Sequence, residues 1–479
     1  MNHLAFKGEI EYTTEKAPEG GAAWGSPMIE QRIFREYDIR GVWEKDLTRT
    51  AVNAIAKAFS FYLKKHLMKD SLTVTVGRDV RLSSPALFSS LVDGLMASGL
   101  DVIDIGACPT PLQYFSLHRL PVDGGIMITG SHNPPEFNGL KLSVGKETLF
   151  GERIQDLRRI LEKGEGVRGS GNMRSYDIIP EYSAYIKNLF GSFEGIKVVV
   201  DAGNGTGGLV APSILRSLDC DVVELYCEPD GRFPNHHPDP VVPENMRDLI
   251  GRVEVEKAHI GIGYDGDSDR IGVVDEDGNV VWGDMLLVLF ARDILAKYPG
   301  AAVIGEVKCS QILFDEVKRL GGNPIMGKVG HSLIKSKMKD TGALLAGEMS
   351  GHVFFADRYF GYDDAIYTSL RLLEILSLKG PPYSLKRLLS DIPPVVATPE
   401  IRVACPDDAK FKVIEQAKAA FFDYPLIDVD GIRIQFDDGW GLIRASNTQP
   451  VIVLRFEAKN RESLNRIQRL VEERLAKLI

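Results

Sequence analysis

Residues 258–272 read AHIGIGYDGDSDRIG, in which a short apolar run ends abruptly in an acidic loop with glycines. Two other stretches share this plan: GGIMITGSHNPPEFNG at residues 124–139 and ALLAGEMSGH at residues 343–352. A buried strand of about four to six residues followed by a polar, glycine-containing loop is typical of an α/β unit. Because ligands of open α/β sheets bind beyond the carboxyl ends of the strands, the three loops could converge on one cleft.

Each of these stretches lies in a larger block that opens with another strand and loop. The openings are LTVTVGRD from Leu72, IKVVVDAGNGTGG from Ile196 and AAVIGEVKCS from Ala301. Helical patterns lie between the strands, as in residues 85–99, so we predict three α/β domains of similar plan. Their sequences align too poorly to prove a repeat. The predicted domains comprise residues 29–177, 178–280 and 281–391.

The two ends of the chain have different patterns. From about residue 392, an alternating strand (GIRIQF), a Trp-Gly turn and a second strand (VIVLRFEA) precede a helix with apolar spacing from Leu464 to Leu478. This pattern predicts a smaller α+β domain at residues 392–479. Residues 1–28 mix charges with small residues and lack the apolar stretch of a signal peptide, and we interpret them as a loosely docked extension.

Composition limits the class of protein. A chain of 479 residues exceeds the roughly 250–300 residues of a single core, which indicates several domains. The net charge of −9 argues against a broad electrostatic grip on nucleic acid or an acidic membrane. No apolar run approaches the roughly 18 residues of a membrane span. The five cysteines are widely spaced without a Cys-x-x-Cys pair, so we expect buried, unpaired thiols and a reducing cytoplasm.

The acidic loop predicts a metal site. Asp265, Asp267 and Asp269 alternate and would point the same way on an extended backbone. Like charges about 4 Å apart repel by roughly 4 kcal/mol at an effective dielectric near 20, and a divalent cation would relieve that repulsion. A solvated acidic turn is the alternative, whereas an EF-hand fails because its sixth position holds Arg270 instead of glycine. Three carboxylates fit Mg²⁺ completed by water or a phosphate oxygen, and Arg270 suggests a phosphoryl group.

The loop after Ile128 concentrates a hydroxyl, an imidazole, amides and an ammonium, the last from Lys141. Taken alone, Ser131 and His132 are equally compatible with a structural turn. The absence of a Gly-x-Ser-x-Gly elbow argues against an ordinary serine hydrolase. Phosphoryl transfer depends mainly on positioning and cationic stabilisation, so the combination with a Mg²⁺-type loop favours that chemistry.

These two loops closely resemble those of the α-D-phosphohexomutase superfamily, specifically its phosphomannomutase/phosphoglucomutase branch, and the resemblance runs from about Ile33 to the C-terminus. It implies a phosphoserine at Ser131, whose phosphate oxygen would join Asp265, Asp267 and Asp269 around Mg²⁺. It also implies a heart-shaped, four-domain architecture with a central cleft, three mixed α/β sheets and a mobile fourth domain. Ser268 departs from the Gly or Ala of many relatives.

Two further loops extend the resemblance. GEMSGH matches the sugar-recognition loop of the family and implies that Glu348 and Ser350 bind the sugar 3- and 4-hydroxyls. RASNTQP matches its phosphate clamp, although RASNT alone would usually be a plain polar turn; a guanidinium with hydroxyl and backbone donors makes an anion nest. The clamp residues would be Arg444, Ser446, Asn447 and Thr448. The resemblance also places Arg40, in YDIRG, at the active site as a catalytic residue, Lys308 among the substrate-binding residues, and His331, in GKVGHS, near the substrate phosphate.

The implied reaction is the reversible interconversion of the 1- and 6-phosphates of mannose and glucose, through a hexose 1,6-bisphosphate. Lys141 and His132 would be candidates for proton transfer, and Arg270 would neutralise the transferring group. The two sugars differ only at the 2-hydroxyl, which neither Glu348 nor Ser350 is expected to read, so we expect dual specificity. The partners would be small sugar phosphates, and a monomer is the usual family expectation.

Three alternatives stay open. One is phosphoglucosamine mutase, whose sugar loop usually has Gln where this chain has Met349. Another is a catalytically silent sugar-phosphate binder on the same fold, which loss of Ser131, an aspartate ligand or Arg270 would have supported. The third is a Mg²⁺-dependent phosphatase, which would release inorganic phosphate continuously.

Overall fold

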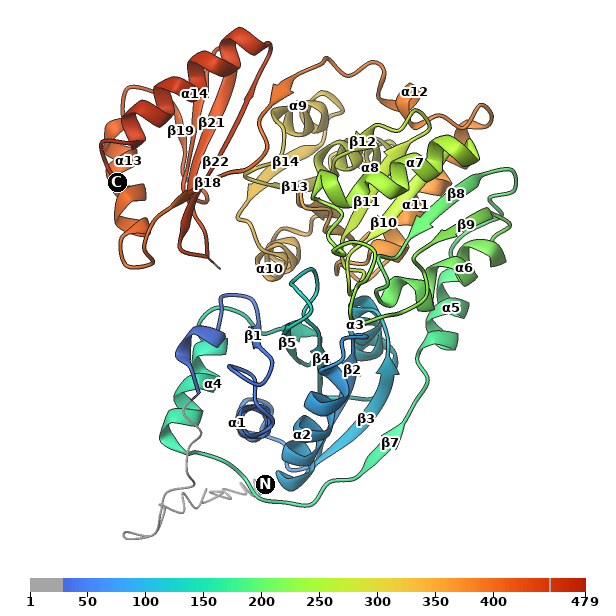
Figure 1. Cartoon of the computed structure of the whole chain (residues 1–479), viewed down its shortest axis with the longest axis vertical. Coiled ribbons are helices and arrows are strands. Elements are labelled where there is room, and N and C mark those ends of the chain that lie inside the picture. The colour runs from blue at the N-terminus through green and yellow to red at the C-terminus, as the bar shows by residue number, and fades with distance from the viewer. Residues whose placement is uncertain (1–28, 448) are drawn as a thin grey trace, which may run out of the picture.

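The computed structural model describes residues 29–447 and 449–479. The predicted N-terminal extension (1–28) and Thr448 of the predicted phosphate clamp lie outside the described residues. Figure 1 shows the chain passing from the blue first domain through the green and yellow domains to the red C-terminal domain. Three mixed sheets and one antiparallel sheet confirm the predicted fold class. Among the described residues, no helix is long and apolar enough to cross a bilayer.

The first sheet has the strand order β1-β5-β4-β2-β3-β7, with β6 paired to β5. Strand β2 is parallel to β3 and β4, whereas β5 is antiparallel to β1 and β4. Helix α1 begins after Thr48, which caps it by accepting from Ala51 N, and its buried residues recur at helical spacing. The elements are η1 (Gln31–Ile33), β1 (Ile39–Val42), α1 (Arg49–Leu67), β2 (Leu72–Arg78), α2 (Ser84–Ala97), β3 (Leu100–Ala107), α3 (Thr110–Arg119), β4 (Gly124–Ile128), β5 (Phe137–Val144), β6 (Glu147–Thr148), α4 (Glu152–Lys163) and β7 (Met173–Ser175).

The second sheet has the order β12-β11-β10-β8-β9. Strands β8, β9 and β10 are parallel; β8 and β10 are apolar runs that are almost entirely buried, whereas β9 lies at the edge of the sheet and is partly exposed. The elements are α5 (Ile179–Lys187), β8 (Lys197–Asp201), η2 (Thr206–Leu209), α6 (Ala211–Ser217), β9 (Asp221–Leu225), η3 (Pro243–Met246), α7 (Arg247–Glu256), β10 (Ile260–Tyr264), β11 (Ile271–Asp275) and β12 (Val280–Val281).

The third sheet, β14-β13-β15-β16, has the same plan on a smaller scale. Its longest helix, α11, begins after Asp364, whose carboxylate accepts from Tyr367 N at 2.8 Å. The elements are α8 (Gly283–Lys297), β13 (Ala302–Glu306), α9 (Gln311–Arg319), β14 (Asn323–Gly327), α10 (His331–Thr341), β15 (Leu345–Gly347), β16 (Val353–Phe355), α11 (Ala365–Lys379) and α12 (Leu385–Leu389).

A common plan relates the three sheets. In each, a strand of the parallel part leads into a polar loop, and the chain returns in an antiparallel strand: β4 to β5, β10 to β11 and β15 to β16. The connecting loops are the three stretches from which the α/β units were predicted. All three therefore lie at the carboxyl ends of parallel strands, which is where open α/β sheets bind ligands.

The C-terminal sheet is antiparallel throughout, with the order β17-β22-β21-β20-β19 and β18 beside β22. The predicted Trp-Gly turn is wrong, because Trp440 and Gly441 lie inside β21 and the chain reverses at residues 437–438. Trp440 is buried and donates its indole N–H to Glu457 at 2.9 Å, which holds it in the sheet. The elements are β17 (Val396–Ala397), β18 (Ile401–Ala404), α13 (Lys410–Ala420), β19 (Leu426–Ile427), β20 (Ile432–Phe436), β21 (Gly439–Ala445), β22 (Val451–Ala458) and α14 (Arg461–Leu475).

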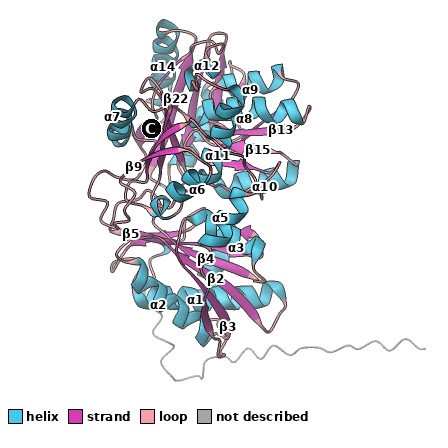
Figure 2. Ribbon diagram, turned by 90° about the vertical axis from the view of Figure 1, so that its right-hand side faces the viewer, coloured by secondary structure: helices cyan, strands magenta, loops and turns pink. Residues whose placement is uncertain are grey.

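The apolar cores are distributed unevenly. One large core joins the second and third sheets to the α3 side of the first sheet, and a second core lies between the first sheet and α1, α2 and α4. Figure 2 shows α1 and α2 on the opposite face of that sheet from α3. The C-terminal domain has a core of its own. All five cysteines are buried and unpaired, as predicted.

Candidate active site

The serine loop begins directly after β4. Ser131 has a φ of 48°, in the left-handed region that a residue with a side chain rarely adopts. Its amide N–H donates to Thr129 Oγ1 at 2.9 Å, and its hydroxyl donates to Asp265 Oδ2 at 2.7 Å. The same hydroxyl lies 3.1 Å from His132 Nδ1. The predicted nucleophile and the acidic loop are therefore in direct contact.

The acidic loop is a turn and not an extended segment. Ser268 N donates to the carbonyl of Asp265 at 3.0 Å, and Ser268 has a φ of 60°. The reasoning from an extended backbone is thus wrong, yet the carboxylates converge because the turn folds them inward. One ligand atom of each of Asp265, Asp267 and Asp269 lies within 4.8 Å of the others, and all three residues are buried.

The chemistry of this cluster fits a hard divalent cation. Asp267 Oδ1 and Asp269 Oδ1 are buried and have no hydrogen-bond partner within the described part of the chain, which is costly unless another group satisfies them. Burial and the two neighbouring carboxylates raise the pKa of Asp265 well above its usual value. A cation would reverse that effect, and oxygen ligands from three carboxylates suit Mg²⁺.

Lys141 lies on β5 beside the cluster. Its Nζ donates to Asp267 Oδ2 at 3.0 Å and also contacts Asp269 Oδ2. Burial disfavours the ammonium, but the two carboxylates outweigh burial and raise the pKa of Lys141 well above its usual value. The side chain is therefore a cation and not a base in this arrangement.

The two predicted active-site arginines both lie near His132 of the serine loop. Arg40 hydrogen-bonds to Asn133 Oδ1 of the serine loop and to Asp38 Oδ2, the latter at 2.5 Å. Arg270 donates from Nε to His352 Nε2 at 2.9 Å. Burial and the nearby guanidinium of Arg270 lower the pKa of His132 well below its usual value, so this imidazole is neutral.

The predicted sugar loop follows β15. Glu348 accepts hydrogen bonds from Gly330 N at 2.6 Å and from Ser350 Oγ at 2.9 Å, so both predicted sugar ligands share one network. His331 is the first residue of α10, and its ring stacks on His352 with centroids 5.5 Å apart. Lys308 follows β13 and donates to Glu400 Oε1 of the C-terminal domain at 2.7 Å.

The predicted phosphate clamp follows β21. Arg444 pairs with Asp430 Oδ2 at 3.1 Å, and Asn447 Nδ2 donates to the hydroxyl of Tyr37 at 2.8 Å. Ser446 Oγ accepts from Gln449 N at 3.2 Å. The Tyr37 ring lies 6.0 Å from the His331 ring between centroids, His331 stacks on His352, and His352 bonds to Arg270. These contacts link the clamp to the acidic loop and bring predicted residues of four domains together.

Sequence comparison shows that the chain is related to a known protein family. Four sequence models of the phosphoglucomutase/phosphomannomutase family match consecutive parts of the chain. They are alpha/beta/alpha domain I at residues 31–167, domain II at 180–278, domain III at 282–395 and the C-terminal domain at 400–474. The chain belongs to this family, and so to the α-D-phosphohexomutase superfamily.

Individual family members are similar over nearly the whole chain. A phosphomannomutase/phosphoglucomutase of Pseudomonas aeruginosa is 46% identical over 94% of this chain and 96% of its own length. A phosphoglucomutase of Neisseria meningitidis is 45% identical over 92% of this chain and 96% of its own. The crystal structure of a phosphoglucomutase/phosphomannomutase family protein from Burkholderia thailandensis superposes with a TM-score of 0.88 at 43% identity, covering 94% of this chain and 98% of that one.

The family site contains residues that the sequence reasoning did not single out. His352 Nε2 accepts from Arg270, so Nδ1 carries a proton; it hydrogen-bonds to the carbonyl of Asp269 at 3.1 Å and also lies 3.0 Å from Asp363 Oδ2. His352 stood within the quoted GEMSGH motif, which was a usable signal. Asp363 precedes the helix cap Asp364, so the sequence offered no way to distinguish the two roles.

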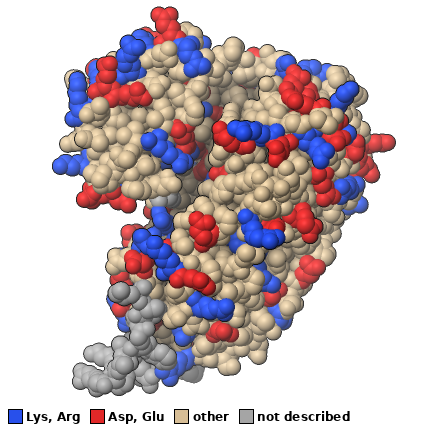
Figure 3. Space-filling view, viewed as in Figure 1, with Lys and Arg blue, Asp and Glu red and all other residues tan. Residues whose placement is uncertain are grey.

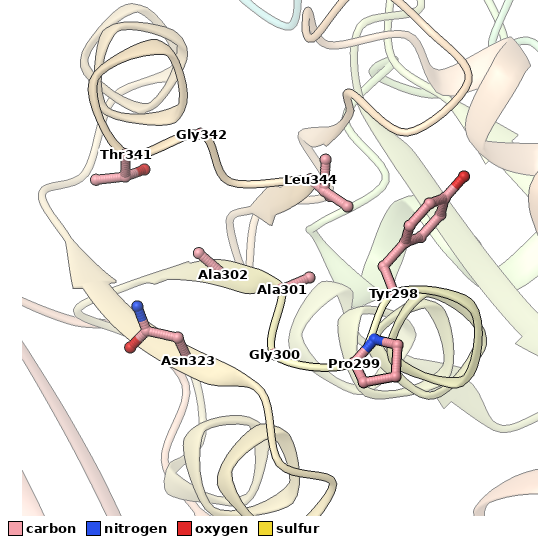
Figure 4. A pocket seen from close by; sticks show the side chains of 9 residues that line it. All are labelled: Tyr298, Pro299, Gly300, Ala301, Ala302, Asn323, Thr341, Gly342 and Leu344. Carbon is pink, nitrogen blue, oxygen red and sulfur yellow. The ribbon is translucent and has the colours of Figure 1, made fainter.

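Open surface cavities lie away from this site. A cavity of about 440 Å³ (Figure 4) is at the amino ends of β13 and β14, whereas the family loops follow the carboxyl ends of strands. Its lining is Tyr298, Pro299, Gly300, Ala301, Ala302, Asn323, Thr341, Gly342 and Leu344. Figure 3 shows acidic and basic side chains intermixed on the face viewed.

Proposed function

We propose that this chain interconverts the 1- and 6-phosphates of glucose and of mannose through a phosphoserine at Ser131 and a hexose 1,6-bisphosphate. The observation that carries the proposal is the contact of Ser131 Oγ with Asp265 Oδ2 at 2.7 Å, inside a buried cluster of three carboxylates. The Ser131 hydroxyl thus lies beside a candidate metal site and near the cationic side chains of Lys141 and Arg270. This arrangement suits phosphoryl transfer, in which positioning and charge neutralisation dominate.

The proposed reaction has two mirrored transfers. The P–O bond at Ser131 Oγ breaks as the free hydroxyl of the hexose phosphate forms a new P–O bond; that hydroxyl gives up one proton, and Ser131 Oγ takes up one proton to become a hydroxyl again. The bisphosphate turns end for end, and its other phosphoryl group returns to Ser131 Oγ. His132, at 3.1 Å from that oxygen, is placed to exchange the proton there, while Lys141 and Arg270 offset negative charge.

The cation would be held by Asp265, Asp267, Asp269 and a phosphate oxygen on Ser131. Bound there, Mg²⁺ supplies charge neutralisation for the transferring phosphoryl group. The unpartnered Asp267 Oδ1 and Asp269 Oδ1 support this assignment.

The hexose phosphate could bind in two orientations because separate loops would bind its sugar hydroxyls and its non-reacting phosphate. Glu348 and Ser350 would hold the sugar hydroxyls in either orientation, and the clamp around Arg444 would take the phosphate that does not react. Lys308, His331, Ser446, Asn447 and Thr448 would complete this half of the site. One chain supplies all of these residues, which supports action as a monomer on free hexose phosphates.

The test is a coupled assay with glucose 1-phosphate, mannose 1-phosphate and glucosamine 1-phosphate, containing Mg²⁺ and a trace of glucose 1,6-bisphosphate. We expect turnover of the first two, its abolition by EDTA and a severe loss in Ser131→Ala. The matched control is Ser60→Ala, a buried serine of α1 whose hydroxyl donates to the carbonyl of Ala56 within the same helix. Turnover of the glucosamine substrate alone would move the assignment to phosphoglucosamine mutase, sustained phosphate release to a phosphatase, and no turnover to a silent binder.

A further inference from the structure

Arg81 is a buried cation that lies outside the four predicted loops. It follows β2 in the sequence GRDVRLSS, and its side chain is fully buried. A guanidinium in such a place must have its donors satisfied and its charge balanced. The contacts that satisfy it lead to the serine loop.

All five N–H donors of Arg81 are used. Nη2 donates to the carbonyls of Ser131 at 2.7 Å and Asn133 at 2.5 Å, and Nη1 donates to those of Pro134 at 2.5 Å and Phe137 at 3.0 Å. Nε donates to Asp79 Oδ2 at 3.1 Å. Guanidinium has five donors in a fixed planar fork, so four backbone carbonyls of one loop are held by one rigid group.

Asp79 contacts both the Arg81 guanidinium and the serine loop. Its Oδ2 also accepts from Gly130 N at 3.0 Å, and its Oδ1 accepts from the backbone N of Arg81 at 3.0 Å. A Cβ on Gly130 would lie 2.5 Å from Arg81 Cζ, so the loop packs directly on the guanidinium. The pair thus holds the backbone on both sides of Ser131, whose φ of 48° is strained for a residue with a side chain.

The second domain covers this arrangement. The ring of Phe233 lies over the guanidinium, 5.1 Å from Arg81 Cζ to the ring centroid. Gly266 of the acidic loop approaches so closely that a Cβ there would lie 2.5 Å from the carbonyl oxygen of Ser131. The carbonyl that Arg81 holds is therefore also in contact with the loop of Asp265, Asp267 and Asp269.

From these contacts we propose that Arg81 is a positioning residue for phosphoryl transfer: it holds the backbone of residues 131–137 so that Ser131 Oγ faces the acidic cluster. The role rests on the proposed function of Ser131. Arg81 acts through backbone carbonyls and touches neither Ser131 Oγ nor the carboxylates of the acidic loop among its hydrogen bonds. Lysine, with three donors and no planar fork, cannot reproduce the arrangement.

The experiment compares Arg81→Lys with wild type and two controls. Arg371→Lys controls for disturbing a buried arginine, since Arg371 is fully buried in the third domain and pairs with Asp357 and Asp293. Arg78→Gln controls for loss of an ion pair on the same segment, because Arg78 pairs with Asp104. Steady-state kinetics and hydrogen exchange of the peptide covering residues 129–138 are measured for all four proteins.

We expect kcat of Arg81→Lys to fall at least 100-fold while KM changes less than threefold, because the sugar and phosphate loops belong to other domains. Exchange at residues 129–138 should be at least tenfold faster than in wild type. The controls should keep kcat within threefold and leave that peptide unchanged. Normal kcat with unchanged exchange in a folded Arg81→Lys protein would overturn the proposal, and so would equal losses in Arg371→Lys.

A second variant serves if Arg81→Lys does not fold. Asp79→Asn keeps the volume but removes the charge that balances the guanidinium, and we expect about a tenfold loss of kcat with an unchanged KM and faster exchange of the same peptide. Wild-type kcat and KM in Asp79→Asn, with normal exchange, would contradict the proposal. If wild type itself lacks mutase activity, the proposed function fails, while hydrogen exchange still decides whether Arg81 holds the loop.

Discussion

Tyr37 and Asn447 are separated by 410 positions in the chain, and Asn447 Nδ2 donates a hydrogen bond of 2.8 Å to the hydroxyl of Tyr37. The same hydroxyl donates to the carbonyl of Val329 at 2.6 Å. One phenol therefore joins the first, third and fourth domains at the edge of the predicted phosphate clamp. Asp430 adds a second link, accepting from both Val329 N and Arg444.

Removal of this hydroxyl should weaken substrate binding more than chemistry. Tyr37→Phe keeps the ring and loses both hydrogen bonds, each contributing roughly 0.5–1.5 kcal/mol. We expect KM for hexose phosphates to rise about three- to tenfold, with kcat changed less than about twofold. Tyr176→Phe, whose hydroxyl bonds to Glu181 away from the site, is the control. An unchanged KM in Tyr37→Phe would show that the link does not matter for binding.

Mg²⁺ should stabilise the protein as well as activate it. A ligand at 100 times its Kd stabilises the folded state by about 2.7 kcal/mol, which corresponds to a rise in Tm of roughly 11–22 °C if a domain of about 100 residues unfolds by itself. Thermal unfolding with and without Mg²⁺ measures the shift. Asp267→Asn should remove most of it, and Asp277→Asn, an exposed carboxylate of the same domain, should not. Equal shifts in all three proteins would place the cation elsewhere.

The sugar loop should not distinguish the two epimers. Ser350 Oγ and the Glu348 carboxylate form one hydrogen-bonded unit at 2.9 Å, and both are predicted to bind hydroxyls that glucose and mannose share. Ser350→Ala should therefore raise KM about fivefold for both sugars and leave the ratio of their kcat/KM values within about twofold. Parallel kinetics with the two substrates provide an internal control. A change in this ratio beyond about tenfold would mean that Ser350 reads the 2-hydroxyl side.

His236 should make the stability of the second domain depend on pH. Its Nε2 lies 2.9 Å from Asp201 Oδ2 and its Nδ1 lies 3.0 Å from the carbonyl of His237; because both partners are acceptors, both nitrogens must donate. Burial alone would lower the pKa of His236, but the hydrogen bond and charge of Asp201 raise it above its usual value. The stabilisation is thus complete below the unfolded-state pKa near 6.5 and is lost as pH rises through the folded-state pKa.

His236→Gln tests this pH dependence. The free energy of unfolding lost in the variant should be about 1 kcal/mol larger at pH 6 than at pH 8.5, since hydrogen bonds to charged groups contribute roughly 1.5–3 kcal/mol. Urea unfolding at both pH values measures the difference, with His66→Gln, an exposed residue of α1, as the control. A loss that does not vary with pH would mean that His236 is neutral when folded.

Local pattern predicted most of the elements that carry the site. The strands before the three loops were readable as short contiguous apolar runs, and the helix in residues 85–99 was readable from its apolar spacing. The motif residues were also readable, since each motif is contiguous. The predicted Trp-Gly turn was wrong. Trp440 is buried, and its burial keeps Trp440 and Gly441 in the sheet instead of in a loop.

The order of the domains, the chemistry available in each loop and the family were all readable from the sequence. Which groups meet depends on the tertiary fold. The acidic loop turns where an extended strand was assumed, and its carboxylates still converge on Ser131. Arg81 finds its carbonyl partners about 50 positions further along the chain, and Tyr37 finds Asn447 at the far end. Apolar periodicity reports only which face is buried. The hydrogen-bond partner of a buried polar group depends on which distant segments pack together. A local sequence pattern does not predict that packing.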